Sequence, residues 1–113
     1  DEVGHADKAE REEKAAERIF GLLPPDVGEE LHALWVEFEA KETAEAKFAG
    51  AIDRLQPFLH NIHTDGRAWG EHGISAKQIR ERNGVIENGS EDLWAYAVSL
   101  LDEAVAKGQV AAE

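Results

Sequence analysis

The sequence predicts an all-helical fold of about five helices, and three observations support this prediction. The apolar residues are mainly Ala, Leu, Val and Ile, with only 7% aromatic residues, a mixture that suits helix packing. Apolar side chains recur at three- and four-residue steps in several segments. Proline, glycine and capping residues divide these segments into helix-length pieces. A chain of 113 residues has room for one core, so we expect residues 1–113 to form a single helical domain.

The first two predicted helices cover residues 7–23 and 26–40. In the first, charged residues of both signs surround an apolar face, a pattern typical of a solvated outer surface. Pro24 and Pro25 end this helix, because the residue before a proline avoids the helical conformation. Asp26 is the expected N-cap of the second helix, since Glu29 follows at the capping-box spacing. The expected buried residues of the two helices are Ala16, Ile19, Phe20 and Leu23, then Val27, Leu31, Leu34 and Phe38.

The third predicted helix carries the strongest periodic signal in the chain. Thr43 is its expected N-cap. Its apolar residues keep a strict alternation of four- and three-residue steps, which predicts one buried stripe. We therefore expect this helix to be central in the fold. The stripe consists of Phe48, Ile52, Leu55, Leu59 and Ile62.

The C-terminal half is predicted to contain a loop, a short helix and a last helix. Residues 64–73 are rich in glycine and form the loop, pinned by Trp69. Ser75 and Gln78 have capping-box spacing and open the short helix, which is expected to end near Asn88 and Gly89. Ser90 caps the last helix, and the tail after Lys107 is expected to fray. The apolar face of the last helix consists of Trp94, Ala97, Leu101, Ala104 and Val105.

The charge balance and the absence of cysteine exclude several classes of function. Twelve Lys and Arg against 24 Asp and Glu give a net charge of −12, which disfavours nucleic acid and anionic membranes as partners. Without cysteine, disulfides and thiolate metal sites are excluded. No apolar run approaches the roughly 20 residues that a membrane-spanning helix needs. These features favour a cytoplasmic protein without membrane or nucleic-acid partners.

The beginning of the chain indicates processing or truncation. The sequence starts at Asp1 and contains no methionine. We therefore expect that it is not an intact primary translation product.

Asp53 is the first candidate for chemistry, because it lies on the helix that we expect to be central. It follows Ile52 on a face that is expected to begin turning inward. A carboxylate in such a place needs a cation, a hydrogen-bond donor or a metal to compensate its charge. The periodicity alone favours a partly exposed carboxylate paired with Arg54 or Lys47.

Three segments of the chain resemble a known enzyme family. Residues 51–57, which read AIDRLQP, are similar to a stretch in the C-terminal half of HD-domain hydrolases of the 5'-deoxynucleotidase type. Residues 15–24 and 34–39 fit the same family, and the match continues more loosely through residues 66–69 and Asn83 to the last helix. The resemblance implies an HD-like helical bundle and hydrolysis of phosphate esters.

The family also implies one divalent metal ion, held by a His, a His-Asp pair and a separate final Asp. The final Asp corresponds to Asp53. No His-Asp dipeptide occurs in this sequence, so we expect the other ligands in helices that precede Asp1. The chain is thus interpreted as the C-terminal portion of a larger HD domain, and we expect it to be inactive alone. The complete protein is expected to be a phosphohydrolase that acts on nucleoside monophosphates or similar small phosphate esters. The resemblance identifies no catalytic residue in this chain other than this metal ligand.

Other side chains offer weaker signals. His60 and His63, followed by Asp65, have a spacing that suits a metal, although histidines near a helix C-terminus are favoured without one. Lys47 and Arg54 lie seven residues apart on one side of the third helix, so they are candidates to bind a substrate phosphate, or simply form a solvated face. The chain has three tryptophans, Trp35, Trp69 and Trp94. We interpret them as anchors of the core or of a loop rather than as a platform on which a ligand stacks.

A different class of function is a non-catalytic helical interaction module. In that interpretation Asp53 is solvated, and the stripe from Phe48 to Ile62 meets another subunit. A homodimer is possible under both hypotheses, because absent upstream helices would also leave apolar surface open.

Overall fold

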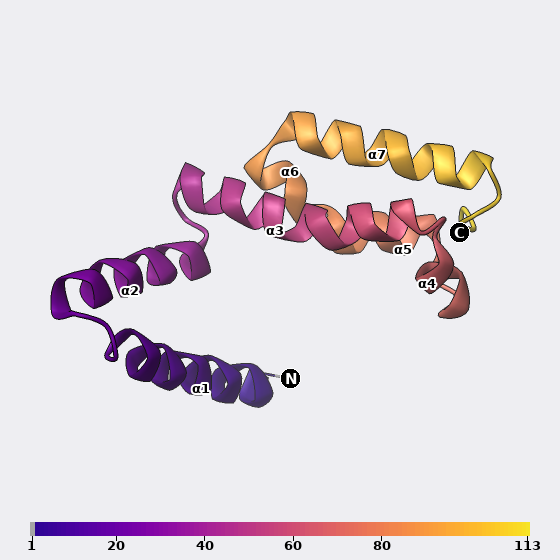
Figure 1. The fold of residues 1–113 in the computed structure, drawn as a ribbon. Helices are drawn as coiled ribbons and strands as arrows, with labels where there is room; N and C mark the ends of the chain where they lie inside the picture. The colour runs from indigo at the N-terminus through magenta and orange to yellow at the C-terminus, as the bar shows by residue number, and fades with distance from the viewer. Residues whose placement is uncertain (1) are drawn as a thin grey trace. The chain divides into compact units, whose positions relative to one another are not determined.

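The computed structural model describes residues 2–113, with side chains described from residue 4 onward. Every regular element in this range is a helix, which confirms the all-helical prediction (Figure 1). The helices form two compact units, one up to residue 40 and the other over residues 41–113. Five helices have eight or more residues, and two short helices, α4 and α6, were not predicted separately. None of the described helices combines the length and the apolar character needed to cross a membrane.

The first unit is a hairpin of α1 (Glu2–Phe20) and α2 (Pro25–Ala40), and both inner boundaries differ from the prediction (Figure 1). Helix α1 ends at Phe20, three residues before the expected end. Helix α2 begins at Pro25, because a proline suits the first helical position, where its missing N–H costs no hydrogen bond. The Pro24 carbonyl accepts the Gly28 N–H at 2.8 Å. Asp26 therefore lies in the first turn, and its prediction as N-cap was wrong.

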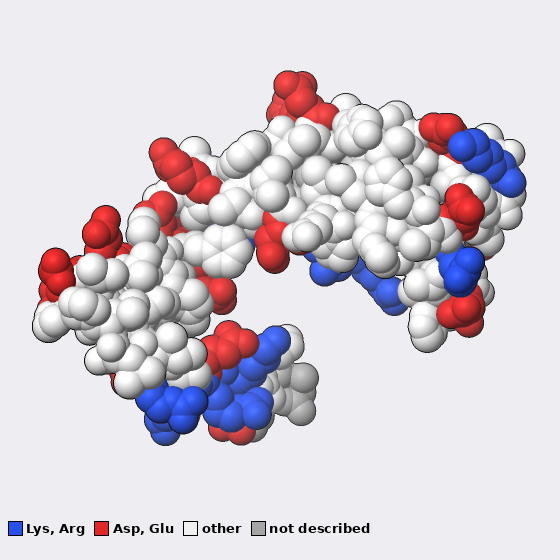
Figure 2. Space-filling model, viewed as in Figure 1, with Lys and Arg blue, Asp and Glu red and all other residues white. Residues whose placement is uncertain are grey.

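The hairpin has a small buried centre. Ala16 and Gly28 are buried, and a Cβ at Gly28 would collide with the Phe20 carbonyl. The His32 ring stacks on Phe20 with ring centroids 5.3 Å apart, and its Nε2 lies 3.2 Å from Oε1 of Glu13. Acidic and basic side chains lie side by side over α1, as predicted for a solvated face (Figure 2). Most of the expected apolar faces are exposed within this unit, namely Ile19, Leu23, Val27, Leu31 and Leu34.

The second unit is built around α3 (Ala44–His63), which confirms the predicted position of this helix. Thr43 caps it, because its side-chain oxygen accepts the Ala46 N–H at 3.1 Å. Helix α3 packs along α6 (Val85–Gly89) and α7 (Glu91–Ala106) (Figure 1). The buried core of the unit consists of Ala51, Leu55, Phe58, Trp69, Ala76, Ile79, Ile86, Ala97, Leu101, Ala104 and Val110.

The predicted buried stripe of α3 is partly wrong. Leu55 is buried, but Phe48 and Ile52 remain 49% and 45% exposed. The buried face instead passes through Ala51 and Phe58, because α6 approaches α3 closely at Ala51. Small side chains permit this backbone approach, and the helix face that is buried as a result is rotated away from Phe48 and Ile52.

Local sequence signals placed the starts of the two remaining predicted helices correctly. The predicted loop of residues 64–73, however, contains a short helix, and the helix expected to end near Asn88 and Gly89 ends at Asn83. Trp69, in α4 (Arg67–Glu71), is buried against Phe58 with ring centroids 5.7 Å apart, so it pins the predicted loop region. Ser75 and Gln78 form the predicted capping box at the start of α5 (Ala76–Asn83). Ser90 accepts the Leu93 N–H and caps α7. The predicted apolar face of α7 is buried or half-buried.

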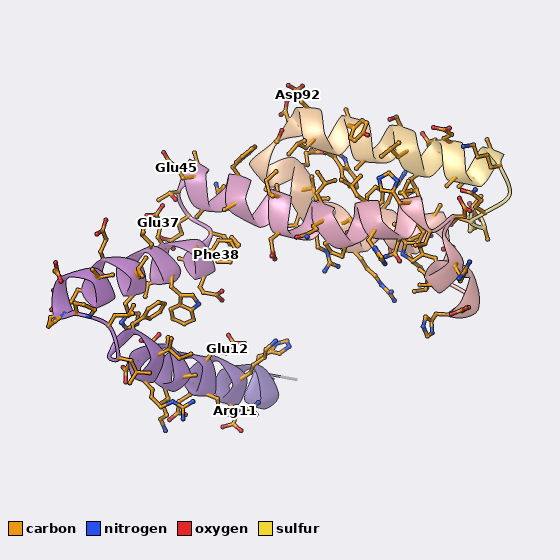
Figure 3. The ribbon with its side chains drawn as sticks, in the orientation of Figure 1. Arg11, Glu12, Glu37, Phe38, Glu45 and Asp92 are labelled. Atoms are coloured by element: carbon orange, nitrogen blue, oxygen red, sulfur yellow. The ribbon has the colours of Figure 1, made fainter. Side chains whose placement is uncertain are left out.

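Acidic residues occupy the first turns of the two longest helices in this unit. Glu45 lies in the first turn of α3 and Asp92 in the first turn of α7 (Figure 3). Negative charge is favourable there, because the helix dipole places partial positive charge at the N-terminus.

The C-terminal tail is ordered against the second unit, so the prediction that it frays was wrong. The Ala111 carbonyl accepts the Ala76 N–H at 2.7 Å. Val110 is only 6% exposed and packs over Gly66, whose φ of +70° favours glycine. This contact gives the tail a buried anchor that the periodicity of the last helix did not indicate.

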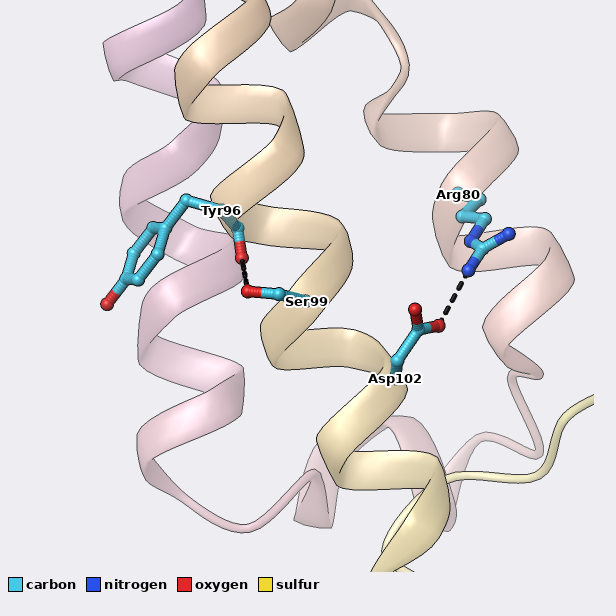
Figure 4. A network of polar contacts seen from close by, with 4 residues as sticks. All are labelled: Arg80, Tyr96, Ser99 and Asp102. Atoms are coloured by element: carbon cyan, nitrogen blue, oxygen red, sulfur yellow. Dashed lines mark hydrogen bonds and ion pairs between the residues drawn. The ribbon is translucent and has the colours of Figure 1, made fainter.

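Helices α5 and α7 are also joined at the surface. Nη2 of Arg80 lies 2.6 Å from Oδ1 of Asp102 (Figure 4). On the same helix as Asp102, the Ser99 hydroxyl donates to the Tyr96 carbonyl at 2.7 Å (Figure 4). Both polar contacts are exposed, so their contribution to stability is small.

Candidate functional site

Asp53 lies in the middle of α3, on the exposed side of the helix within the second unit. At 3.6 residues per turn it points nearly opposite the buried stripe of Ala51, Leu55 and Phe58. The expectation that this face turns inward was therefore wrong for residues 41–113. The carboxylate is accessible, and a cation bound to it would lie outside the core of this unit.

The pairing that the periodicity favoured is absent from the described structure. Among residues 4–113, the Asp53 carboxylate makes no ion pair or hydrogen bond with Arg54, Lys47 or any other side chain. Arg54 instead donates from Nη2 to the carbonyl of Arg82 at 3.2 Å. The carboxylate thus keeps its full capacity to accept a cation.

The described residues do not by themselves fit a metal ion. Within the part of the chain that the structure describes, no three His, Asp or Glu side chains are grouped closely enough to hold one. His60 and His63 lie in the last turn of α3, and Asp65 accepts a hydrogen bond from Gln109 Nε2 at 3.3 Å. One carboxylate is too little for a stable site, since divalent metals take four or more ligands in proteins.

The two basic candidates on α3 have different surroundings. Lys47 is exposed near the start of the helix. Arg54 lines a cleft of about 160 Å³ together with Arg82 of α5. Sequence reasoning missed Arg82, because it lies 28 residues from Arg54 and carries no motif of its own. The structure therefore pairs Arg54 with a residue of another helix rather than with Lys47.

Two of the three tryptophans belong to the core of the second unit. Trp69 is buried, and Trp94 packs against the same cluster. In the first unit, Trp35 is half-buried and its ring lies 6.0 Å from the His32 ring. Trp69 and Trp94 act as anchors, as the sequence predicted.

Comparison with known families decides the classification. The family model described as HD domain matches residues 1–94. The chain belongs to the HD domain family. Most of this HD domain chain, from α1 into the first turn of α7, lies within the match.

Solved and curated relatives give the HD domain chain a more specific setting. A predicted metal-dependent phosphohydrolase from Magnetospirillum magnetotacticum MS-1, known from a crystal structure, is 55% identical in sequence to this chain. The two structures superpose over 95% of this chain with a TM-score of 0.81. The 5'-deoxynucleotidase HDDC2 of Homo sapiens is 41% identical over 59 residues, and that of Mus musculus is 39% identical over 59 residues. Each of these two matches covers 52% of this chain.

The HD domain chain corresponds to only part of each relative. It covers 57% of the Magnetospirillum chain. The matched segment covers 29% of the human protein and 30% of the mouse protein. These proteins therefore contain residues with no counterpart in this chain.

Proposed function

We propose that this HD domain chain is part of a metal-dependent phosphohydrolase that acts on nucleoside monophosphates or similar small phosphate esters. The observation that carries the proposal is the 55% identity over 95% of the chain with a predicted metal-dependent phosphohydrolase. The names of the curated 5'-deoxynucleotidase relatives favour a nucleotide as the substrate. The net charge of −12 is consistent with a small substrate rather than a nucleic acid.

Asp53 is the residue that we propose as a metal ligand from this chain. Its carboxylate is exposed and has no partner among residues 4–113. Because the Asp53 carboxylate faces away from the core of the second unit, it cannot bind a metal that is buried within that unit. The remaining ligands of the proposed metal site would therefore come from outside residues 41–113. When bound, a divalent metal would supply positive charge for the phosphate group, and the contribution of this chain would be one hard oxygen ligand.

The proposal is tested by phosphate release from nucleoside 5'-monophosphates with the complete gene product. We expect release to stop when a chelator removes the metal and to return when one divalent metal is added back. Release that continues in excess chelator, or no release from any monophosphate with any divalent metal, would contradict the proposal.

Exposed apolar side chains favour a second candidate function, the non-catalytic interaction module. Phe48 and Ile52 are exposed on α3, as a partner-binding surface requires. If this were the only function, the complete gene product would associate through this face and release no phosphate under any metal condition. A homodimer and a cytoplasmic location stay predictions under both functions.

A further inference from the structure

The second unit contains a polar cleft between α3, α4 and α5 that the metal-ligand role of Asp53 does not use. Its volume is about 160 Å³, below the roughly 300–1,000 Å³ of pockets for drug-sized ligands. The buried rings of Phe58 and Trp69 contribute to its apolar lining, together with Pro57, Ile74 and Ile79. The polar lining comes from Arg54, Asn61, Arg82 and Asn83. The cleft is therefore sized for a small polar ligand.

The charge of this lining is unusual for the chain. Acidic residues outnumber basic ones by 24 to 12, yet no carboxylate lines the cleft. Among residues 4–113, neither Arg54 nor Arg82 forms an ion pair with an Asp or Glu. Figure 2 shows basic side chains gathered along the lower edge of this unit, below α3. Two guanidinium groups without a carboxylate make this cleft a local positive site.

The orientation of the donors is partly fixed by the backbone. Nη2 of Arg54 donates to the Arg82 carbonyl at 3.2 Å, which ties its side chain to the end of α5. Nδ2 of Asn83 donates to the Ile79 carbonyl at 2.7 Å. The Asn61 amide is half-buried and has no side-chain partner among residues 4–113. The held arginine loses less side-chain entropy when a ligand binds, and the Asn61 amide has its donors available for that ligand.

We propose that the cleft lined by Arg54, Arg82 and Asn61 binds a tetrahedral phosphate group, either free phosphate or the phosphoryl group of a small ester. Guanidinium groups match phosphate oxygens in geometry and charge, and the Asn61 amide adds a neutral donor. The cleft lies about 100° around α3 from Asp53, since Arg54 is the next residue of the helix. Binding here needs no metal, so it stands apart from the proposed metal-ligand role.

The test is titration calorimetry of the 113-residue chain at low salt in buffer that contains a chelator. The two probes are inorganic phosphate and a nucleoside 5'-monophosphate. We expect at least one probe to bind, and Arg82→Gln to weaken that binding about tenfold, as loss of a charged hydrogen bond does. Tighter binding of inorganic phosphate identifies the free ion as the ligand, and tighter binding of the monophosphate identifies the ester.

Three further variants distinguish binding at this cleft from non-specific attraction of the anion by positive charge, and circular dichroism detects loss of structure. Arg54→Gln should also weaken binding about tenfold, whereas Arg54→Lys, which keeps the charge but loses the fork of donors, should be intermediate. Arg67→Gln removes an exposed charge from outside the cleft and should leave binding unchanged. Arg82→Gln leaves the Arg82 carbonyl in place, so its helical circular dichroism should match that of the unaltered chain. The proposal is overturned if neither probe binds at millimolar concentration, or if Arg67→Gln weakens binding as much as Arg82→Gln.

Discussion

Gly89, the last residue of α6, lies so close to Ala51 of α3 that a Cβ on the glycine would stand 2.6 Å from the Ala51 Cβ. The same added atom would also collide with the backbone carbonyl of Lys47. The two backbones therefore meet without a side chain between them. This contact brings Ile86, which is fully buried, into the core beside α3.

The first prediction is that Gly89→Ala destabilises the chain. The collision involves the Lys47 backbone, which cannot move without shifting α3, so the cost should be about 1–3 kcal/mol or more, as for an overpacked core. The free energy of unfolding from urea titration measures this cost. Gly70→Ala is the matched control, because a Cβ there meets nothing within 4 Å. We expect Gly70→Ala to leave stability unchanged or raise it by up to about 1 kcal/mol, and equal stability of the two variants would contradict the proposed packing.

The second prediction concerns which side of α3 is buried. Leu55→Ala should cost about 2–5 kcal/mol, because Leu55 lies in the core. Ile52→Ala removes a side chain that is 45% exposed and should cost clearly less, about 1 kcal/mol or below. Thermal unfolding of both variants of the 113-residue chain makes the comparison. If Ile52→Ala lost more stability than Leu55→Ala, Ile52 would lie on the buried side of α3, as the sequence predicted.

The fold shows which sequence signals are reliable. Thr43, Ser75 and Ser90 act as caps as predicted, because a cap depends on atoms within three residues of it. The rotation of α3 depends instead on the approach of Gly89, which is far away in the sequence. A large apolar residue in a regular pattern therefore indicated a helix correctly but not its buried side.

The third prediction is that the C-terminal tail stabilises α5. Ending the chain after Gln109 removes the buried Val110 and two hydrogen bonds, from the Ala76 N–H to the Ala111 carbonyl and from the Lys77 N–H to the Ala112 carbonyl. We expect the free energy of unfolding to fall by about 2–5 kcal/mol, from one buried valine and two hydrogen bonds. Amide hydrogen exchange should also become faster at Ala76.

The control for the tail is a chain that ends after Ala112. It lacks only the exposed Glu113 and keeps Val110 and the two residues that accept the hydrogen bonds, Ala111 and Ala112. Its stability and its exchange at Ala76 should equal those of the full chain. If the chain that ends after Gln109 is as stable as this control, the tail does not anchor α5.

The candidate site could be predicted only in part. Asp53 was singled out through its local motif, and its exposure agrees with the partly exposed carboxylate that the periodicity favoured. The buried side of α3 could not be predicted, because it is set by contacts with other helices. Arg54 was found as a basic residue, but its partner Arg82 becomes a neighbour only when α5 packs beside α3. Residues that share a cleft through tertiary packing leave no spacing pattern in the sequence.

The central claim is that Asp53 binds the metal of a phosphohydrolase, and substitution of this carboxylate in the complete gene product tests it most directly. Asp53→Asn keeps the shape and removes the charge. We expect phosphate release from nucleoside monophosphates to fall at least about 100-fold, with loss of bound metal, since even outer ligands of metal sites contribute 10–100-fold. Glu81→Gln, which neutralises another exposed carboxylate of the second unit, should keep full activity and metal content. Full activity and unchanged metal content of Asp53→Asn would contradict the claim.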